Sequence, residues 1–518
     1  MSYCAHWLEF DCIVVGSGHA GSCAALAAVD AGCKKVLMID KCPEAWMGGN
    51  GYFTAGAHRT VHDGLKDLLS LLATPPPANE VERIDVDPYT DADFVADIQR
   101  LGSGRADVEL VDALVHNSRD AIGWLRERVG VEFTLSFNRQ AYEVDGRMKF
   151  WGGMALSVKE GGKGLIRSHR KALTEAGVKV WFEARAVELT MESRSVGEAI
   201  SGIVVERDGQ KLVIKTRSVV LAAGGFEASR EMRIKYLGEE WGNAKVRGTP
   251  YNTGDGFELA RSVGARMAGD WKGCHSTAWD ANASSEGGER ELTNQYTKSG
   301  YPLGIMVNMD GRRFVDEGED FRNYTYAKFG RAILQQSGGC AFQIWDGKVL
   351  NHLRKEEYGD DVVKKAWAAS IEELADKLGG SEWGLENKGQ FVETVREFND
   401  AVRKGVAPGH EWNPATKDGL STQELAIPKT NWALTIDTPA LMAVKVACGI
   451  TFTFGGLAID ARTAGVVSAA SGKVIPGLFC TGEMVGGLFY GNYPGGSGLT
   501  AGAVFGRKAG NAAGELMS

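Results

Sequence analysis

The chain has 518 residues, of which 44% are hydrophobic and 24% are charged, and its formal net charge is −8. This length is enough for about two or three domains with sizeable cores. The negative charge argues against nucleic acid, and against an anionic membrane surface, as the main partner. No segment has the ~18 uninterrupted apolar residues of a membrane helix, so we expect no membrane span.

The cysteines indicate a reducing environment. Nine are present, and none forms a C-x-x-C pair with another. They are Cys4, Cys12, Cys23, Cys33, Cys42, Cys274, Cys340, Cys448 and Cys480. Several fall in predicted strands or helices, where free thiols pack as small hydrophobic groups. We therefore expect a cytoplasmic protein without a structural metal site.

The first predicted elements form a strand-turn-helix-strand unit over residues 10–40. The apolar residues 13–15 predict a short buried strand, and the alanine-rich residues 24–31 predict a helix. Residues 36–39 predict a second strand. This order of elements is typical of the first half of a dinucleotide-binding fold.

The turn of this unit carries the residues expected to hold a dinucleotide. Gly16, Gly18 and Gly21 have G-x-G-x-x-G spacing, with Ala20 between the last two, and Asp40 follows Gly18 by 22 residues. The open N–H groups and positive dipole end of the helix favour a pyrophosphate, and the acid can accept a ribose hydroxyl. The unit predicts a dinucleotide site without distinguishing NAD from FAD.

A loop after Asp40 combines glycines with polar residues. It is flexible enough to wrap a ligand and polar enough to hydrogen-bond one. The candidate cofactor-binding residues in it are Lys41, Gly48, Gly49, Asn50, Thr54 and Gly56. Further on, residues 75–93 contain three successive prolines and several acids and predict an exposed excursion. Residues 91–130 predict two or three surface helices.

The middle of the chain repeats the pattern of apolar strands that run into glycines. The predicted elements are a helix at 161–177, a strand at 178–182, a hairpin of 200–206 with 211–216, a buried strand from 218, and a helix at 257–263. Paired glycines follow the buried strand, and a glycine turn precedes the last helix. The candidate cofactor-binding residues here are Ala186, Ala223, Gly224, Gly225 and Asp255.

Residues 272–432 differ in character from the rest. Aromatic, amide and charged residues mix there without the strand-glycine pattern, and residues 390–404 predict an amphipathic helix. We interpret this segment as a second domain, inserted into the first and covering the substrate. The strand-glycine pattern returns after residue 432, so the first domain is predicted to comprise residues 1–271 and 433–518.

The C-terminal part decides between the two dinucleotides. An apolar strand at 475–480 leads to Gly482 and Glu483, and a helix at 501–510 follows Ser497, Gly498 and Leu499. An NAD site is usually completed within one compact half, whereas two distant ends that meet over one ligand suit the longer FAD. We expect residues 482–483 to reach the ribityl and pyrophosphate, and residues 498–499 to present N–H groups to the flavin ring.

Several motifs, taken in order, resemble one flavoprotein family. They are the N-terminal unit, Gly48-Gly49-Asn50, Ala222–Phe226, Gly254-Asp255-Gly256, residues 311–317, and the stretch from Pro476 to Glu483. The chain resembles the family of fumarate reductase, succinate dehydrogenase and ketosteroid dehydrogenases, and residues 449–457 and 487–498 are similar to its tricarballylate dehydrogenase branch. The resemblance implies an α/β fold, with a discontinuous Rossmann-like FAD-binding domain and an inserted α+β capping domain.

The resemblance also implies roles for individual residues. Arg322 lies where fumarate reductases keep the arginine that delivers a proton, although by itself it would be interpreted as a surface cation. His275 matches the histidine that binds a substrate carboxylate, although an isolated histidine is more often a core residue. Asn50 replaces the histidine to which succinate dehydrogenases attach FAD, so we expect the FAD to be noncovalent.

Other positions depart from the family pattern. Phe452 stands in place of a second histidine, Tyr493 in place of a carboxylate-binding arginine, and Tyr296 and Thr297 near the place of an acidic relay. Fumarate and succinate therefore do not fit well. Tyr490 and Tyr493 offer phenol donors and aromatic faces to a larger or less charged molecule, so both are candidate site residues.

We expect an FAD-dependent oxidoreductase that dehydrogenates, or in reverse reduces, a CH–CH bond next to a carboxylate or carbonyl of a small-molecule substrate. Hydride passes to flavin N5 in this hypothesis, Arg322 handles the proton, and a separate acceptor takes the electrons. That acceptor is a protein, a quinone-linked carrier or oxygen. Two alternatives remain: an enzyme of polycyclic or steroid-like ketones, and a flavin-binding electron-transfer subunit without its own substrate.

Overall fold

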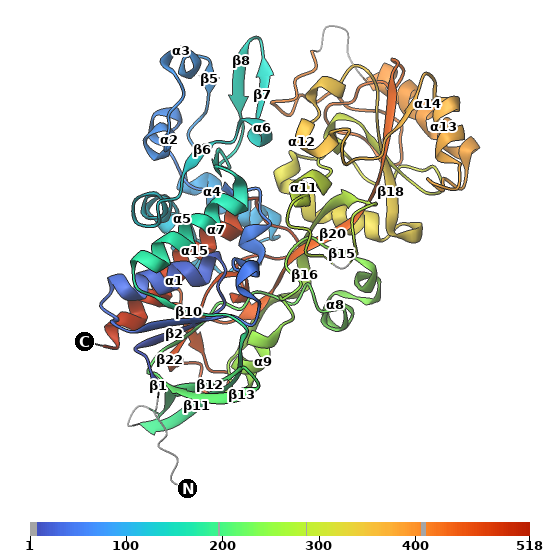
Figure 1. Cartoon of the computed structure of the whole chain (residues 1–518). Coiled ribbons are helices and arrows are strands. Elements are labelled where there is room, and N and C mark those ends of the chain that lie inside the picture. The colour runs from blue at the N-terminus through green and yellow to red at the C-terminus, as the bar shows by residue number, and fades with distance from the viewer. Residues whose placement is uncertain (1–7, 195–196, 286, 406–410, 518) are drawn as a thin grey trace.

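A computed structural model describes residues 8–194, 197–285, 287–405 and 411–517. The chain forms two lobes, joined by long strands that run from one lobe to the other (Figure 1). Of the cysteines, Cys4 lies outside the described residues, and the other eight are free thiols. Among the described helices, none is both long enough and apolar enough to cross a membrane.

A six-stranded sheet forms the centre of the larger lobe. Its strands in spatial order are β10 (Lys179–Trp181), β3 (Val36–Ile39), β2 (Cys12–Val15), β14 (Val219–Leu221), β22 (Val474–Cys480) and β21 (Gly465–Val467). All neighbours are parallel except β21 and β22. Because β2, β3 and β14 are buried along their whole length, their sequences are unbroken runs of apolar residues. The strands predicted at residues 13–15 and 36–39 are confirmed.

The two ends of the chain pack against each other, as predicted. In Figure 1, α1 (His19–Asp30), α7 (Gly161–Glu175) and α15 (Ser497–Glu515) lie on the same face of the sheet. Glycines four residues apart let α15 approach α1 closely: a Cβ on Gly506 would lie 2.7 Å from the carbonyl oxygen of Ala20, and one on Gly510 would lie 2.3 Å from that of Ala24. The contact therefore joins backbone to backbone.

A four-stranded sheet covers the other face. Its order is β1 (Leu8–Glu9), β13 (Gln210–Lys215), β12 (Gly197–Arg207) and β11 (Ala184–Arg194). The predicted hairpin is confirmed as β12–β13, and Asp208 and Gly209 at its turn have φ values of 52° and 71°. Positive φ at both central residues is the conformation of a type I′ turn. The long strand β11 was not predicted from the sequence.

The second lobe is built on a sheet that contains the longest strand of the described chain, β20 (Leu441–Leu457). Its partners are β15 (Lys245–Val246), β16 (Met267–Asp280), β18 (Cys340–Trp345) and β19 (Ala366–Ala368), and β17 (Ile305–Asn308) pairs with β18. The helices of this region are α10 (Thr293–Tyr296), α11 (Arg322–Leu334), α12 (Lys355–Tyr358), α13 (Ile371–Leu378) and α14 (Lys388–Gly405).

The hydrophobic cores follow the two lobes. One large cluster draws on residues 10–274 and 448–513 together with Leu334, and two smaller clusters draw on residues 278–446. The α14 helix confirms the amphipathic helix predicted at 390–404, with Phe391, Val395 and Phe398 buried. The predicted domain boundaries at 271/272 and 432/433 stay a prediction, and β16 runs across the first of them.

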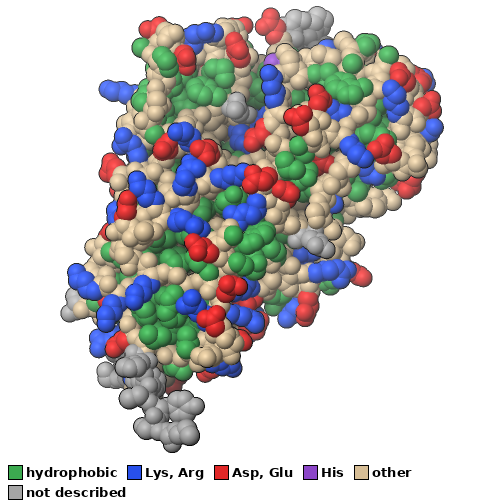
Figure 2. Space-filling model, viewed as in Figure 1, with side chains coloured by type: hydrophobic (Ala, Val, Ile, Leu, Met, Phe, Trp, Pro, Cys, Tyr) green, Lys and Arg blue, Asp and Glu red, His purple; other side chains and the backbone are tan. Residues whose placement is uncertain are grey.

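The segment between β3 and β10 adds helices and two small sheets. Its helices are α2 (Leu65–Leu71), α3 (Ala78–Val81), α4 (Asp91–Leu101), α5 (Val108–Trp124) and α6 (Phe137–Gln140). Its sheets are β4 (Ala57–His58) with β9 (Leu156–Val158) and β6 (Phe133–Leu135), and β5 (Ile84–Asp85) with β8 (Arg147–Phe150) and β7 (Ala141–Val144). In Figure 1 the β7–β8 hairpin stands beside the second lobe. Figure 2 shows acidic and basic side chains interspersed over the visible face of both lobes.

Candidate functional site

A cavity of about 290 Å³ extends from the N-terminal end of α1 to the strands that join the lobes. Its walls include β2, β3, β11 and α15 of the larger lobe, and β16, β20 and α11 toward the smaller one. Residues from both ends of the chain and from the inserted segment therefore face one continuous space. A space of this form suits a long ligand with a second molecule beside one of its ends.

The glycine turn before α1 forms one end of the cavity. Gly16 has φ of +111°, and a Cβ there would lie 2.2 Å from the carbonyl oxygen of Ala222. A Cβ on Gly21 would lie 2.1 Å from the carbonyl oxygen of Gly16. Gly18 caps α1 without a side-chain hydrogen bond, so the first N–H groups of the helix are open to an anion.

Asp40 is fixed beside this turn at the end of β3. The backbone N–H and the hydroxyl of Ser17 donate to its Oδ2 at 2.8 and 2.7 Å. Next to it, the Nζ of Lys41 lies 3.1 Å from Asp255 at the start of α9 (Asp255–Ser262). All three predicted residues line the cavity, with the acid at the end of the second strand as the dinucleotide fold requires.

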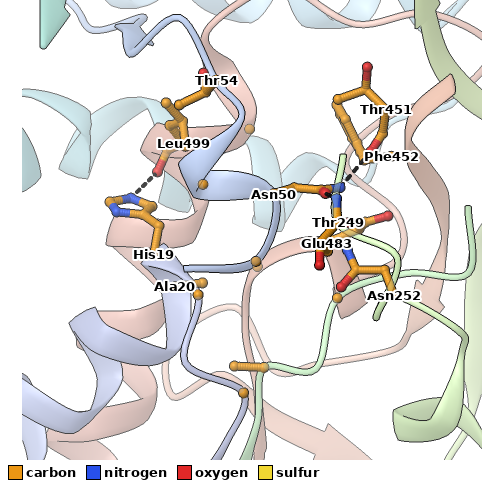
Figure 3. A pocket seen from close by; sticks show the side chains of 18 of the residues that line it. His19, Ala20, Asn50, Thr54, Thr249, Asn252, Thr451, Phe452, Glu483 and Leu499 are labelled. Atoms are coloured by element: carbon orange, nitrogen blue, oxygen red, sulfur yellow. Dashed lines mark hydrogen bonds between the residues drawn. The ribbon is translucent and has the colours of Figure 1, made fainter. Parts of the chain in front are cut away.

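Asn50 and the half-buried Glu483 lie in the cavity wall (Figure 3), and the buried Glu227 contacts Asn50 from outside the lining. Asn50 donates from Nδ2 to Oε1 of Glu227 and to the carbonyl oxygen of Thr451, each at 2.6 Å. Oε1 of Glu483 accepts the backbone N–H of Thr453 at 2.8 Å. Burial raises the pKa of Glu227, and burial together with the negative charge of Glu227 raises the pKa of Glu483. The two carboxyl groups therefore cannot both be readily ionised.

Glu227 was not predicted, although it lies two residues after the paired glycines. The partners of Glu227 follow only from the tertiary structure. Besides the amide of Asn50, its Oε1 accepts a hydrogen bond from Nδ2 of Asn252 at 2.6 Å. Close contacts with Glu483 and Asn252 also explain why glycines occupy positions 224 and 225. A Cβ on Gly225 would lie 1.9 Å from Oε1 of Glu483, and one on Gly224 would lie 2.6 Å from the amide of Asn252.

A pair of histidines supports the N-terminus of α15. His19 Nε2 lies 2.9 Å from the carbonyl oxygen of Leu499 (Figure 3), and its Nδ1 lies 2.8 Å from Nε2 of His169. Because the carbonyl only accepts, His19 donates through Nε2 and accepts at Nδ1 from His169. Burial lowers the pKa of His19 to about 4, so the ring is neutral at pH 7.

The same histidines and Cys23 form a group whose ligand atoms lie within 4.8 Å of one another. A metal there would have to break the His19–His169 hydrogen bond. It would also need a thiolate, whereas burial raises the pKa of the Cys23 thiol. The group does not fit a metal well, and the predicted absence of a structural metal stays a prediction.

The start of α15 forms the side of the cavity where the flavin ring is expected to lie. Gly496 precedes the helix with φ of +85°. The N–H of Ser497 donates to the carbonyl oxygen of Pro494 at 3.2 Å, which leaves the N–H groups of Gly498 and Leu499 without a capping side chain. Gly498 and Leu499 line the cavity, while the hydroxyl of Ser497 is turned to the carbonyl oxygen of Pro494 at 2.5 Å. Open helix ends, glycines with no room for a Cβ and an acid beside one turn all fit the predicted FAD.

Most of the predicted cofactor-binding residues line the cavity. They are Gly16, Gly18, Ala20, Asp40, Lys41, Gly49, Asn50, Thr54, Ala186, Ala223, Gly224, Asp255, Gly482, Glu483, Gly498 and Leu499. The others support the wall from behind: Gly21, Gly48, Gly56, Gly225 and Ser497. Contact of each residue with the cofactor stays a prediction.

Aromatic side chains and His275 form the cavity wall toward the second lobe. The ring of His275 on β16 lies 4.8 Å from that of Tyr493 and 5.6 Å from that of Phe452 on β20. The ring of Tyr326 on α11 lies 5.9 Å from His275. Burial, together with the charge of Arg247, lowers the pKa of His275 to about 3. His275 is therefore a neutral hydrogen-bonding group.

The structure does not bring Arg322 and Tyr490 to this wall. Arg322 starts α11 and is buried, but its Nη2 donates to the carbonyl oxygen of Arg139 at 2.6 Å and its Nη1 to the hydroxyl of Tyr142 at 3.2 Å. Burial and the charge of Arg354 lower its pKa. The ring of Tyr490 lies 4.9 Å from the guanidinium of Arg105. Neither residue is part of the cavity lining.

Three arginines line the cavity and were not anticipated: Arg185 on β11, Arg139 and Arg247. Arg139 comes from α6, and Arg247 directly follows β15. Arg139 is paired, with Nη2 at 2.9 Å from Glu356 and Nη1 at 3.6 Å from Glu357. Arg139 and Arg247 reach the cavity through contacts between distant segments, and no local motif marks them.

The chain is similar to known proteins over almost its whole length. A family model described as "FAD binding domain" matches residues 11–499. "Probable fumarate reductase Ifc3" of Shewanella frigidimarina (strain NCIMB 400) is 30% identical over 501 residues, covering 96% of this chain and 74% of that protein. The "4-oxocyclohex-2-ene-1-carboxylate 5-dehydrogenase" of Sinomonas cyclohexanicum is 26% identical, covering 98% of this chain and 94% of that protein. A solved structure of the open conformation of a flavocytochrome c3 fumarate reductase superposes with a TM-score of 0.68 at 28% identity, covering 98% and 78% of the two chains.

Proposed function

Because the chain belongs to the FAD-binding family of fumarate reductases and related flavoproteins, and is an FAD-dependent oxidoreductase acting on CH–CH groups, we propose that its substrate is an organic acid. In the proposed reaction a CH–CH bond next to a carboxylate or carbonyl is desaturated, or the alkene is reduced in reverse. The similarity to the tricarballylate dehydrogenase branch motivates the desaturation direction.

One observation carries this proposal. The open helix ends that suit a pyrophosphate and a flavin ring share a single cavity with the wall of His275, Phe452 and Tyr493. A molecule held at that wall lies beside the flavin end of the bound cofactor. Bound FAD supplies the hydride acceptor for the reaction.

The residues of the chain have separable tasks in this proposal. His275 offers a neutral hydrogen bond to the substrate, and the rings of Phe452 and Tyr493 exclude water from the reacting bond. The Glu227–Glu483 pair holds a proton next to the cofactor. Arg322 as the proton-transfer residue remains part of the proposal, and it requires the guanidinium to leave Arg139 and enter the cavity.

We propose that the FAD is noncovalent and that the electrons leave to a separate acceptor, such as a protein, a quinone-linked carrier or oxygen. The Asn50 side chain is fully engaged by Glu227, Thr451 and the N–H of Thr249, and an amide does not form the histidyl link expected of succinate dehydrogenases. Acid precipitation should therefore release all of the yellow chromophore into the supernatant.

Anaerobic reduction of the bound flavin tests the proposal. Saturated organic acids should bleach the flavin absorbance, and unsaturated acids should reoxidise dithionite-reduced protein. Cyclic ketones without a carboxylate form the second arm of the test. They are included because the aromatic wall, and the similarity to a dehydrogenase named for a cyclic enone carboxylate, favour a ring-shaped substrate. A protein whose flavin responds only to cyclic ketones would point to the alternative function. No response to either class would point to an electron-transfer subunit.

A further inference from the structure

A half-buried arginine without an acidic partner among the described residues faces the cavity. Arg247 lies deep between the lobes, where its backbone N–H donates to the carbonyl oxygen of Ile450 at 2.8 Å. Its accessible surface opens into the cavity, and no carboxylate of the described residues forms an ion pair with it. Its closest polar contact is with the hydroxyl of Thr451 at 3.4 Å, and its guanidinium lies 5.6 Å from the ring of Trp279.

The other cations of the cavity wall are already paired. Lys41 and Arg185 share Asp255, each at 3.1 Å, next to the turn that precedes α1. Arg139 is paired with Glu356 at 2.9 Å. Removing a cation from water without a counter-charge costs several kcal/mol, and the cost is recovered when an anion binds. Among the lining cations, Arg247 is thus the one whose charge a ligand must balance.

Two further polar groups of the cavity lining also lack partners. The Nδ1 of His275 and the hydroxyl of Thr297 are buried and make no hydrogen bond within the described residues. The charge of Arg247 acts on the His275 ring, and both side chains line the same cavity. A carboxylate can accept from a guanidinium and from a neutral imidazole at once. The unpaired groups therefore match one carboxylate in number and in chemistry.

From these contacts we infer that Arg247 binds a carboxylate of the substrate, with His275 as second donor, while Phe452 and Tyr493 hold its apolar part. The positive charge that position 493 lacks is thus provided by the residue that follows β15. Because Arg247 is a single uncompensated cation, the site suits a monocarboxylate with an apolar or cyclic body better than a tricarboxylate. The inference rests on the proposed function, of which it specifies the substrate class.

The test compares an acid with its neutral isostere. Binding of cyclohex-1-enecarboxylate and of its primary amide is measured from the change in absorbance of the oxidised flavin, in wild type, Arg247→Met and Arg247→Lys. Wild type should prefer the acid. Arg247→Met should weaken acid binding on the order of 30-fold, which is the loss expected of charge-assisted hydrogen bonds, and should change amide binding little. Arg247→Lys should restore part of the preference.

Controls separate this inference from folding and from the proposed function. Arg261→Met, on the surface of α9 beside Glu258, should leave both affinities unchanged. An unchanged acid-to-amide ratio in Arg247→Met would overturn the inference. Loss of FAD with an unchanged ratio in the remaining holoprotein would instead assign Arg247 to the cofactor and overturn it too. If wild type prefers the acid but no acid exchanges electrons with the flavin, the proposed reaction fails while the carboxylate site stands.

Discussion

The guanidinium of Arg322 and that of Arg354 converge on one backbone oxygen, the carbonyl of Arg139. Their Nη2 atoms lie 2.6 and 2.7 Å from it. Both arginines belong to the second lobe, and Arg139 belongs to the segment before the β7–β8 hairpin. The rings of Trp151 and Phe321 stack 4.2 Å apart beside them. These contacts link the segment 139–151 to the lobe that covers the cavity.

This link leads to the first prediction, on Arg322. Loss of the contact between the lobes alone should raise the KM of Arg322→Gln about 10-fold, with a smaller effect on kcat. Arg354→Gln should behave alike, because it loses the same carbonyl contact. The proposed proton-transfer role of Arg322 adds to this a loss of about 10²–10⁴-fold in kcat, which Arg354→Gln should not share. Steady-state kinetics of the two variants distinguish these outcomes.

The Glu227–Glu483 pair leads to the second prediction. Since the pKa of Glu483 is raised in the folded protein, the folded state keeps a proton that the unfolded chain loses above about pH 4.5. Stability should therefore fall as the pH rises above this value. Glu483→Gln removes the ionisable group, so its thermal midpoint relative to wild type should increase from pH 5 to pH 8. Exposed Glu258→Gln should show no such trend, and a flat difference for Glu483→Gln would contradict the shared proton.

The buried histidines lead to the third prediction. Burial lowers the pKa of His19 to about 4 and that of His58 to about 3. The unfolded chain takes up protons below about pH 6.5 while the folded protein does not, so stability should be lost as the pH falls from about 6.5 toward 4. Chemical unfolding at pH 7, 6 and 5 should show a smaller loss in His19→Gln than in wild type. The surface variant His116→Gln serves as the control.

Helix packing leads to the fourth prediction. A Cβ on Gly510 would lie 2.3 Å from the carbonyl oxygen of Ala24, so Gly510→Ala must push α15 away from α1. We expect a loss of about 1–3 kcal/mol in the free energy of unfolding, together with weaker FAD retention. Gly123→Ala, near the C-terminal end of α5 with its nearest neighbour atom at 3.7 Å, should be neutral or slightly stabilising. Equal effects of the two substitutions would show that helix contact is not the cause.

The parts of the fold that depend on short-range order were predictable from sequence. The unit at residues 10–40 needs only a local pattern of apolar residues and glycines, and the strands, turn and helix were found where expected. The side chains that face the cavity from the second lobe depend on distant pairings instead. Arg247 is placed by its contact with Ile450, and Glu227 is held by Asn50 and Asn252. The direction of the Arg322 side chain likewise depends on Arg139 and Tyr142, which no local motif reveals.

The glycine contacts of α15 also constrain how the protein is synthesised. The partners of α1 and β2 include α15 and, through β14, the strand β22, which the ribosome makes more than 400 residues later. At about 5–20 residues per second, α1 waits tens of seconds with its alanine face uncovered while the intervening lobe folds. The nascent chain should therefore acquire its flavin only after α15 has left the ribosome. Until then, the exposed N-terminal unit is the segment on which a chaperone would be expected to act.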